Sequence, residues 1–191
     1  MDIWQGQRVR LRGVEPADAE VFFAWDRDSE MARSVDYVWP PSSLEATRRW
    51  AESVATQKAE NDIFFLVIEN NDGEMVGVIN THGCDRRVGA FKYGIAIRRE
   101  HRRKGYAFEA ILLLLRYFFE ELRYQKVTVH VHANNPASSR LHERLGFQPE
   151  GRLRRMVFTQ GQYFDELLYG MTAEEFHELH PALATDLSDE R

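Results

Sequence analysis

Arg102-Arg103-Lys104-Gly105-Tyr106-Ala107 joins a predicted strand, residues 90–97, to a predicted helix that begins near Gly105. The first N–H groups of a helix have no partner inside it, so they point outward and attract an anion. Gly105 lets the backbone bend tightly and approach a ligand without a side chain in the way. The two arginines and the lysine add positive charge. This stretch therefore predicts a cradle for a pyrophosphate group.

The length and composition indicate one soluble globular domain. The 191 residues are enough for a domain with its own core, and 43% of them are hydrophobic and 29% charged. The net charge of -5 argues against general affinity for nucleic acid, because nucleic-acid-binding proteins usually carry a basic excess. We therefore expect no nucleic-acid partner. An RNA-associated ribosomal factor is an alternative that depends on the basic stretch alone.

Three features of the sequence favour the cytoplasm and no membrane partner. The longest apolar run, residues 111–115, is far too short to cross a bilayer. The first residues lack the basic, apolar and small-residue regions of a signal peptide. Cys84 is the only cysteine and cannot form an internal disulfide, which favours a reducing compartment.

Hydrophobic periodicity and turn residues predict a mixed α/β fold without a linker. Ser43 and Gly146 are the clearest helix boundaries, as an N-cap and a C-cap. The turn Asn70-Asn71-Asp72-Gly73 tolerates the left-handed backbone that a hairpin demands. The predicted strands are residues 9–11, 63–69, 74–81, 90–97, 126–133, 158–162 and 164–171, and the predicted helices are residues 15–25, 44–54, 107–122 and 138–145.

A second motif follows the predicted strand 126–133. It reads Asn134-Asn135-Pro136-Ala137-Ser138-Ser139-Arg140-Leu141-His142-Glu143-Arg144-Leu145-Gly146-Phe147. Alone, the basic glycine stretch is weak evidence, because a basic loop is usually a solvated surface. The order strand, basic glycine loop, helix, strand, Asn-x-x-Ser, helix and Gly-Phe resembles the GNAT superfamily of acetyl-CoA-dependent N-acetyltransferases. The resemblance is strong over residues 89–147 and looser over the whole chain.

The tail narrows the resemblance further. Segments 146–154 and 161–165 are similar to the branch that acetylates ribosomal-protein N-termini or polyamines such as spermidine. The resemblance implies one GNAT-like domain over residues 1–191, of the α+β (mixed α/β) class, with a central, mostly antiparallel sheet that is splayed in the middle and flanked by helices. Residues 1–60 would form acceptor-side helices, residues 89–147 the acetyl-CoA-binding core, and residues 148–191 a closing hairpin and tail.

The resemblance implies acetyl-CoA as co-substrate and no metal. Backbone amides of the first stretch would bind the pyrophosphate, that is Arg102, Arg103, Lys104, Gly105, Tyr106 and Ala107. Ile95 and Ile97 lie on a strand that would pair with the pantetheine amides, so the sheet must open beside it. Asn135 and Ser138 would contact the cofactor arm. For Asn135 the alternative is a structural turn residue before a proline, and for Ser138 it is the N-cap of the following helix.

The resemblance also suggests residues for proton transfer. Ser138 is a candidate to protonate the departing thiolate, and His142 stands where many relatives carry a tyrosine as general acid. His142 is equally consistent with a helix residue without a catalytic part. The general base is open, because Lys92 replaces an acidic residue of the polyamine branch. Glu150 is one candidate for the base, and Glu100 and Asp165 are further candidates.

The N-terminal aromatic residues suggest an acceptor pocket. Tyr37 and Trp39, beside a proline-broken loop, are predicted to wall it, whereas Trp25 and Trp50 fit core packing. His130 and His132 share one strand face, but no carboxylate or cysteine stands at a convincing metal-ligand spacing.

The function expected from the sequence is direct transfer of an acetyl group from acetyl-CoA to a primary amine. Backbone N–H groups near Ile95 would stabilise the oxyanion. The acceptor is expected to be a protein N-terminus. A polyamine or another small amine, including an antibiotic, is the alternative acceptor, and a non-catalytic acyl-CoA-binding module is the alternative class. The apolar tail strands favour a homodimer.

Overall fold

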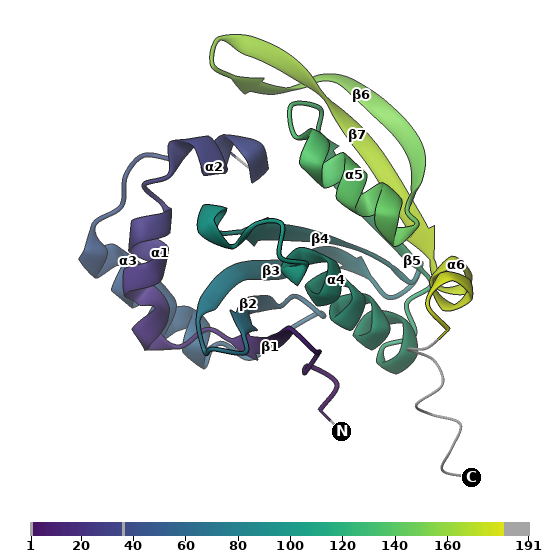
Figure 1. The fold of residues 1–191 in the computed structure, drawn as a ribbon, viewed down its shortest axis with the longest axis horizontal. Helices are drawn as coiled ribbons and strands as arrows, with labels where there is room; N and C mark the ends of the chain where they lie inside the picture. The colour runs from purple at the N-terminus through teal and green to yellow at the C-terminus, as the bar shows by residue number, and fades with distance from the viewer. Residues whose placement is uncertain (1, 36, 182–191) are drawn as a thin grey trace.

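The computed structural model describes residues 2–35 and 37–181. Within them, the strands form a single sheet, against which the helices pack (Figure 1). In chain order, the elements are β1 (Val9–Gly13), the 3-10 turn η1 (Pro16–Asp18), α1 (Ala19–Trp25), α2 (Ser29–Val35), α3 (Leu44–Thr56), β2 (Phe65–Asn70), β3 (Met75–Asp85), β4 (Ala90–Ile97), the 3-10 turn η2 (Arg99–His101), α4 (Tyr106–Arg116), the π-helical turn η3 (Tyr117–Glu121), β5 (Lys126–His132), α5 (Pro136–Leu145), β6 (Gln148–Thr159), β7 (Gln162–Thr172) and α6 (Ala173–Leu179).

The strands form one mixed sheet that opens in its middle. Its order is β1-β2-β3-β4-β5-β7-β6, and every neighbouring pair is antiparallel except β4 and β5. β4 and β5 run parallel and pair from Ala90–Lys126 to Lys92–Thr128, after which the register ends. We call the region beyond this last pair the split. The predicted mostly antiparallel sheet, splayed in the middle, is confirmed.

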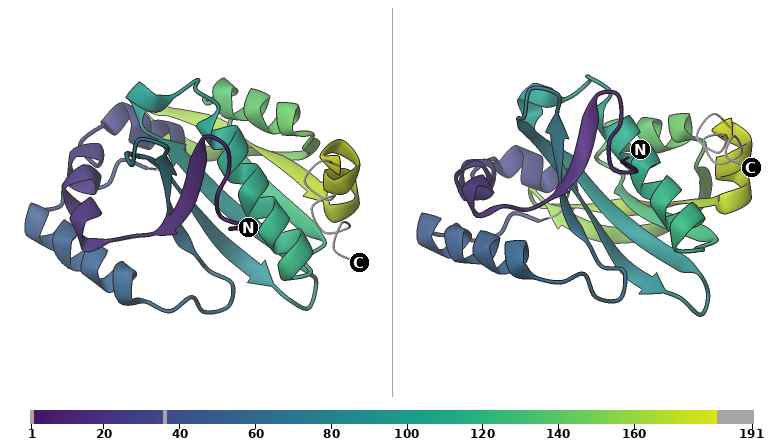
Figure 2. Two further views of the ribbon diagram at one scale, coloured as in Figure 1. Left: turned by 60° about the horizontal axis from the view of Figure 1, so that its bottom comes forward. Right: turned by 90° about the horizontal axis from the view of Figure 1, so that it is seen from below.

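Helices cover both faces of the sheet. Because side chains alternate along a strand, neighbouring residues of β2 enter different cores. Ile68 packs in the larger core with α4, whereas Val67 packs with Phe22 of α1 and Ala51 of α3. Figure 2 shows α4 running along one side of the sheet and α1 and α3 beyond its other side. The two cores therefore lie on opposite faces of the sheet.

The larger core anchors the paired half of β4. Phe91 of β4 is 1% exposed and stacks on Phe118, with ring centroids 3.9 Å apart. An aromatic pair of this kind adds about 1 kcal/mol to the effect of burying its area. Phe91 is also the register partner of Val127 of β5, so this packing anchors β4 where it still pairs with β5, one residue pair before the split.

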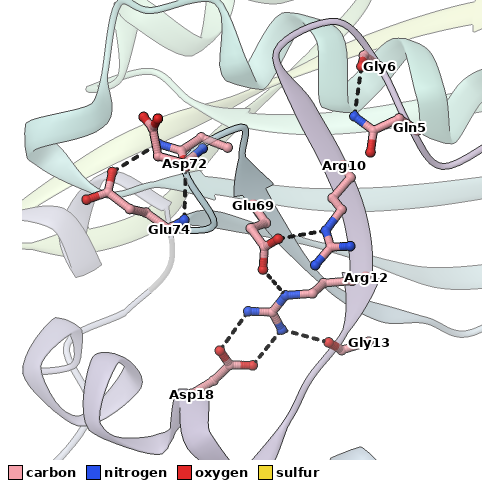
Figure 3. Close-up of polar contacts among 10 residues, drawn as sticks. Gln5, Gly6, Arg10, Arg12, Gly13, Asp18, Glu69, Asp72 and Glu74 are labelled. Carbon is pink, nitrogen blue, oxygen red and sulfur yellow. Dashed lines mark hydrogen bonds and ion pairs between the residues drawn. The ribbon is translucent and has the colours of Figure 1, made fainter.

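An ion-pair network joins η1, just before α1, to the sheet edge (Figure 3). Arg12 of β1 donates to both carboxylate oxygens of Asp18, at 2.8 and 2.9 Å, and also pairs with Glu69 of β2. Burial acts to raise the pKa of the Asp18 carboxyl, but hydrogen bonds from Arg12 and from the Glu15 N–H hold that pKa below its ordinary value. Arg10 adds a second ion pair to Glu69 at 2.6 Å.

Most predicted elements are present, although several differ in extent from the prediction and two helices are additional. The predicted helix 107–122 is α4 followed by the π-helical turn η3. β6 begins at Gln148, well before the predicted strand 158–162, because its exposed first half shows no apolar alternation. The helices α2 and α6 were not predicted. The division into residues 1–60, 89–147 and 148–191 stays a prediction.

Candidate active site

The basic stretch forms an exposed loop at the start of α4. Gly105 is the N-cap of α4 with φ 87°, a left-handed conformation that favours glycine. Arg103 also has a positive φ, 64°. Arg102 folds back, since its Nε donates to the carbonyl of Ile97 at 3.2 Å. The loop thus lies directly beyond the open end of β4 and presents the first N–H groups of α4 to solvent.

Arg8 is a further cation at this loop that the sequence did not reveal. Its Nη1 donates to the carbonyl of Lys104 at 3.2 Å. The backbone N–H groups of Arg8 and Val9 both donate to the Glu109 carboxylate, which straps the N-terminal segment onto α4. No local pattern signals this contact, because Arg8 and Lys104 are 96 residues apart.

The split contains a small cavity of about 60 Å³. We call it the split cavity. It is lined by Val35, by Tyr93, Gly94 and Ile95 of β4, by Val129, His130, Val131 and His132 of β5, and by Asn135, Ser138 and His142. β3 pairs with β4 as far as Ile97, whereas β5 leaves the opposite edge of β4 after Lys92. That edge offers backbone groups to an extended ligand.

Asn135 and Ser138 meet at the start of α5. The helix begins at Pro136, and Oδ1 of its N-cap Asn135 accepts a hydrogen bond from the Ser138 N–H at 3.2 Å. The interpretation of Ser138 as N-cap is therefore wrong, because a proline at the first helical position moves the cap one residue upstream of it. The structural role of Asn135 is present, and both side chains line the split cavity.

His142 is buried at 2% exposure beneath this helix start. Its Nδ1 lies 2.9 Å from the carbonyl of Ser138, and its Nε2 lies 2.9 Å from the hydroxyl of Tyr93. A carbonyl oxygen only accepts, so we assign the ring proton to Nδ1 and the donated hydrogen bond at Nε2 to Tyr93. Burial lowers the pKa of His142 to about 4, which keeps the ring neutral at pH 7.

The three carboxylates predicted as candidate bases form ion pairs elsewhere. Glu150 on β6 pairs with Lys126, Glu100 pairs with Arg98 at 2.6 Å, and Asp165 pairs with Arg152 at 2.5 Å. None of the three belongs to the described lining of the split cavity.

A different polar chain crosses the sheet at the vertex of the split. Nδ1 of His130 lies 3.0 Å from the Glu166 carboxylate of β7, and Nε2 lies 3.2 Å from Nζ of Lys92. In the sequence, His130 suggested only a metal ligand, at a spacing that was not convincing, and nothing indicated Glu166. Their contact joins strands that are distant along the chain, so spacing did not signal it.

A larger, aromatic cavity of about 510 Å³ lies between α1, α2, α3 and the sheet. We call it the aromatic cavity. Tyr37 and Trp39 line it, with ring centroids 6.2 Å apart and nearly perpendicular planes, and their role as walls of an acceptor pocket stays a prediction. Trp25 and Trp50, predicted to pack in the core, line it as well. The other lining residues are Phe22, Asp26, Asp28, Met31, Ala32, Val35, Val38, Pro40, Pro41, Ser42, Ala46, Thr47, Phe65, Val78 and Ala96.

The two cavities adjoin. Val35 lines both of them. The ring centroid of Tyr37, in the aromatic cavity, lies 6.5 Å from that of His132, which lines the split cavity. In the part of the chain that the structure describes, no cluster of three or more His, Cys, Asp or Glu side chains is arranged to hold a metal. Over the same residues, no helix combines the length and apolar character needed to span a bilayer.

Comparisons with known proteins agree with this geometry. A family model described as an acetyltransferase (GNAT) domain matches residues 8–148. The SPbeta prophage-derived uncharacterized N-acetyltransferase YokL of Bacillus subtilis is 42% identical over 177 residues, covering 93% of this chain and 97% of that protein. The spermidine N(1)-acetyltransferase of Vibrio cholerae is 31% identical over 158 residues, covering 83% of this chain and 89% of that protein.

The solved structures show the same fold. The crystal structure of spermidine N-acetyltransferase from Vibrio cholerae in complex with CoA and spermine matches with a TM-score of 0.77 and 22% identity, over 90% of this chain and 99% of that one. The predicted resemblance to the GNAT superfamily, and to a branch that includes spermidine acetyltransferases, is confirmed. Acetyl-CoA is accordingly the co-substrate and an amine the acceptor. The chain belongs to the GNAT family of N-acetyltransferases.

Proposed function

We propose that this enzyme acetylates a primary amine that carries an apolar group, such as a protein N-terminus, and that the amine enters through the aromatic cavity. The observation that carries the proposal is the junction of the two cavities at Val35 and Tyr37. An acceptor in the aromatic cavity would lie beside the split, where the thioester is expected.

The donor is proposed to lie along the open edge of β4. The pyrophosphate would sit at the loop from Arg102 to Ala107, where Arg8 adds a cation. The pantetheine would pair with the backbone near Ile95 and Ile97, an edge that β5 leaves open. Asn135 would contact the arm from the start of α5, because its side chain lines the split cavity.

The reaction is proposed to be direct attack of the amine on the thioester carbonyl. Backbone N–H groups near Ile95 would stabilise the oxyanion. Ser138 and His142 would protonate the departing thiolate. The Ser138 hydroxyl lies 3.4 Å from Nδ1 of His142. Glu150 is a weaker candidate for proton transfer, because it is paired with Lys126 outside both cavities.

The walls of the aromatic cavity favour an acceptor with one charge and an apolar body. Its described lining contains two acidic residues, Asp26 and Asp28, and Asp28 is bound by Arg99 at 2.8 Å. Burial raises the pKa of Asp26. A polyamine carries several ammonium groups, and a largely apolar wall in which Asp26 has no ion-pair partner among the described residues offers them few partners. Aromatic faces do attract a single ammonium group.

A panel of amines tests the proposal. Release of free CoA would be followed with spermidine, with simple amines and with peptides that begin with apolar or polar residues. We expect the highest kcat/KM for an amine or N-terminus beside an apolar side chain. A preference for spermidine would favour the polyamine alternative. Binding of acetyl-CoA without turnover of any amine would favour the non-catalytic module.

We also propose that the enzyme is a cytoplasmic homodimer. Leu153, Met156, Phe158 and Tyr163 on the β6–β7 hairpin are 38%, 55%, 55% and 55% exposed. Apolar side chains gathered in this way favour a protein partner. Light scattering of the purified protein would give twice the mass of one chain, and Phe158→Glu would reduce it to that of one chain. A monomer in the unmodified protein would contradict this proposal.

A further inference from the structure

We infer that His130 is the general base that takes a proton from the acceptor amine, with Glu166 as its positioning residue. The inference rests on the proposed function, since it requires an amine that attacks at the split. It fills the position left open by Lys92, which stands where an acidic residue was expected from the resemblance.

The polar chain lies at the vertex of the split. Lys92 and Thr128 form the last residue pair that joins β4 and β5. His130 lies two residues after Thr128, on the same face of β5. Glu166 lies on β7, and His132 of β5 is its partner in the sheet register. His130 lines the split cavity together with Gly94 and Ile95. A base at this place would be next to the carbonyl that the amine attacks.

His130, the proposed base, and His142, proposed to act on the thiolate, lie on opposite faces of the sheet. Val129 and Val131 of β5 point into the core beneath α4 and α5, so His130 and His132 point to the opposite face. That face carries the aromatic cavity, which Tyr37 connects to His132. His142 packs against Tyr93 in the core on the α5 side. The amine would thus approach from one face while the thiolate leaves towards the other.

The hydrogen bonds of His130 prepare one ring nitrogen as an acceptor. The Glu166 carboxylate accepts from Nδ1–H at 3.0 Å, which leaves the lone pair on Nε2. Lys92 donates to that lone pair at 3.2 Å. An incoming ammonium group would take the place of the Lys92 N–H at Nε2. Glu166 then balances the imidazolium that forms, as carboxylates do in other catalytic pairs.

The charges around His130 come from three neighbouring strands. Lys92 lies on β4, Glu166 on β7 and His82 on β3, where His82 is the register partner of Lys92. Burial lowers the pKa of His82, and the positive charges of Lys92 and His130 act in the same direction. Among the described residues, Glu166 is the carboxylate in direct contact with His130, at 3.0 Å.

The proton balance of the step closes without another reactant. One proton of the ammonium passes to Nε2 of His130, and the freed lone pair forms the C–N bond. The C–S bond then breaks, the thiolate takes the proton of the Ser138 hydroxyl, and the second proton lost by the nitrogen restores that hydroxyl. His130 returns its proton to solvent through a side chain that is 34% exposed.

The decisive experiment compares His130→Gln with His177→Gln across pH. His177 is a matched control on α6, with a side chain 41% exposed. We expect His130→Gln to lower kcat/KM about 100-fold. It should also abolish the acidic limb of the pH profile while acetyl-CoA affinity and thermal stability stay unchanged. His177→Gln should match the unmodified enzyme. An unchanged limb and rate in a folded His130→Gln enzyme would overturn the inference.

Two charge variants distinguish a positioning role from a structural one. Glu166→Gln removes the charge that favours imidazolium, so the acidic limb should move to lower pH. Lys92→Met removes the opposing charge, so the limb should move to higher pH. Shifts in the same direction, or no shift in either enzyme, would contradict the assignment. His132→Gln should retain the limb, because Nδ1 of His132 has no carboxylate partner in the structure. If the unmodified enzyme acetylates no amine, the proposed function itself fails.

Discussion

The hydroxyl of Tyr93 on β4 lies 2.9 Å from Nε2 of His142 on α5, and this buried pair closes one side of the split. Both side chains are at most 5% exposed. Burial raises the pKa of Tyr93 well above its usual value and lowers that of His142. Both groups therefore stay neutral at pH 7.

The buried His142 predicts a loss of stability in acid. Its pKa is about 4 in the folded protein, below the value of about 6.5 for an unfolded histidine. Between about pH 6.5 and pH 4, His142 is protonated in the unfolded chain but stays neutral in the folded one. The free energy of unfolding therefore falls as pH falls through this window. The loss should reach roughly 3 kcal/mol at the acid end.

The double variant Tyr93→Phe/His142→Phe tests this assignment without leaving an unpartnered hydroxyl. Urea unfolding at pH 7 and at pH 4.5 should show a smaller difference in the variant than in the unmodified protein. An equal difference in both proteins would mean that His142 is not the group that titrates.

The Arg12 network predicts a second, separate effect on stability. Arg12→Met would leave the carboxylates of Asp18 and Glu69 buried with fewer partners, and we expect a loss of about 3 kcal/mol at pH 7. The pKa of each carboxyl is held below its usual value in the folded protein. Their contribution is therefore present above the unfolded pKa and disappears as pH falls through the folded one, so the loss should shrink near pH 3.

Arg49→Met is the matched control for this change. Arg49 pairs with Glu45 on α3, with side chains 76% and 63% exposed. A pair of this kind contributes less than about 1 kcal/mol. Equal losses for Arg12→Met and Arg49→Met in urea unfolding would contradict a structural role for the Arg12 network.

Gly105→Ala should weaken acetyl-CoA binding about 10-fold, because a left-handed residue with a side chain is strained and shifts the loop. Gly161→Ala is matched in backbone strain, since φ is 87° at Gly105 and 74° at Gly161. Gly161 lies in the β6–β7 turn, so its substitution should leave the affinity unchanged. Calorimetric titration would measure both. Equal affinities in the two variants would argue against a phosphate site at this loop.

The sequence predicts those features of this site that depend on neighbouring residues, but not the contacts between residues far apart in the chain. Gly105 and Gly146 lie at element boundaries that are visible in local patterns, whereas the helix that begins after Asn135 was predicted to begin at Ser138. The split itself followed from a family resemblance. Arg8 and the His130–Glu166 contact depend on chain segments brought together by folding, so no local spacing indicates them. The helix α6 was not predicted, although the capping box of Thr172 and Glu175 is a local signal for its start.

The aromatic cavity predicts a selective effect on the acceptor. Trp39 is 69% exposed and lines this cavity, so Trp39→Ala should raise KM for the amine about 5-fold and leave KM for acetyl-CoA unchanged. Ile63→Ala is the control, because Ile63 is 53% exposed and lies outside the cavity lining. Steady-state kinetics with both substrates varied would separate the two constants. A rise confined to KM for acetyl-CoA would place Trp39 on the donor side.

Calorimetric titration of the unmodified protein with acetyl-CoA tests the central claim most directly. The open edge of β4 and the loop before α4 predict saturable binding of one acetyl-CoA per chain, with a dissociation constant below about 1 mM. Absence of binding at that concentration, in protein shown to be folded, would contradict the account.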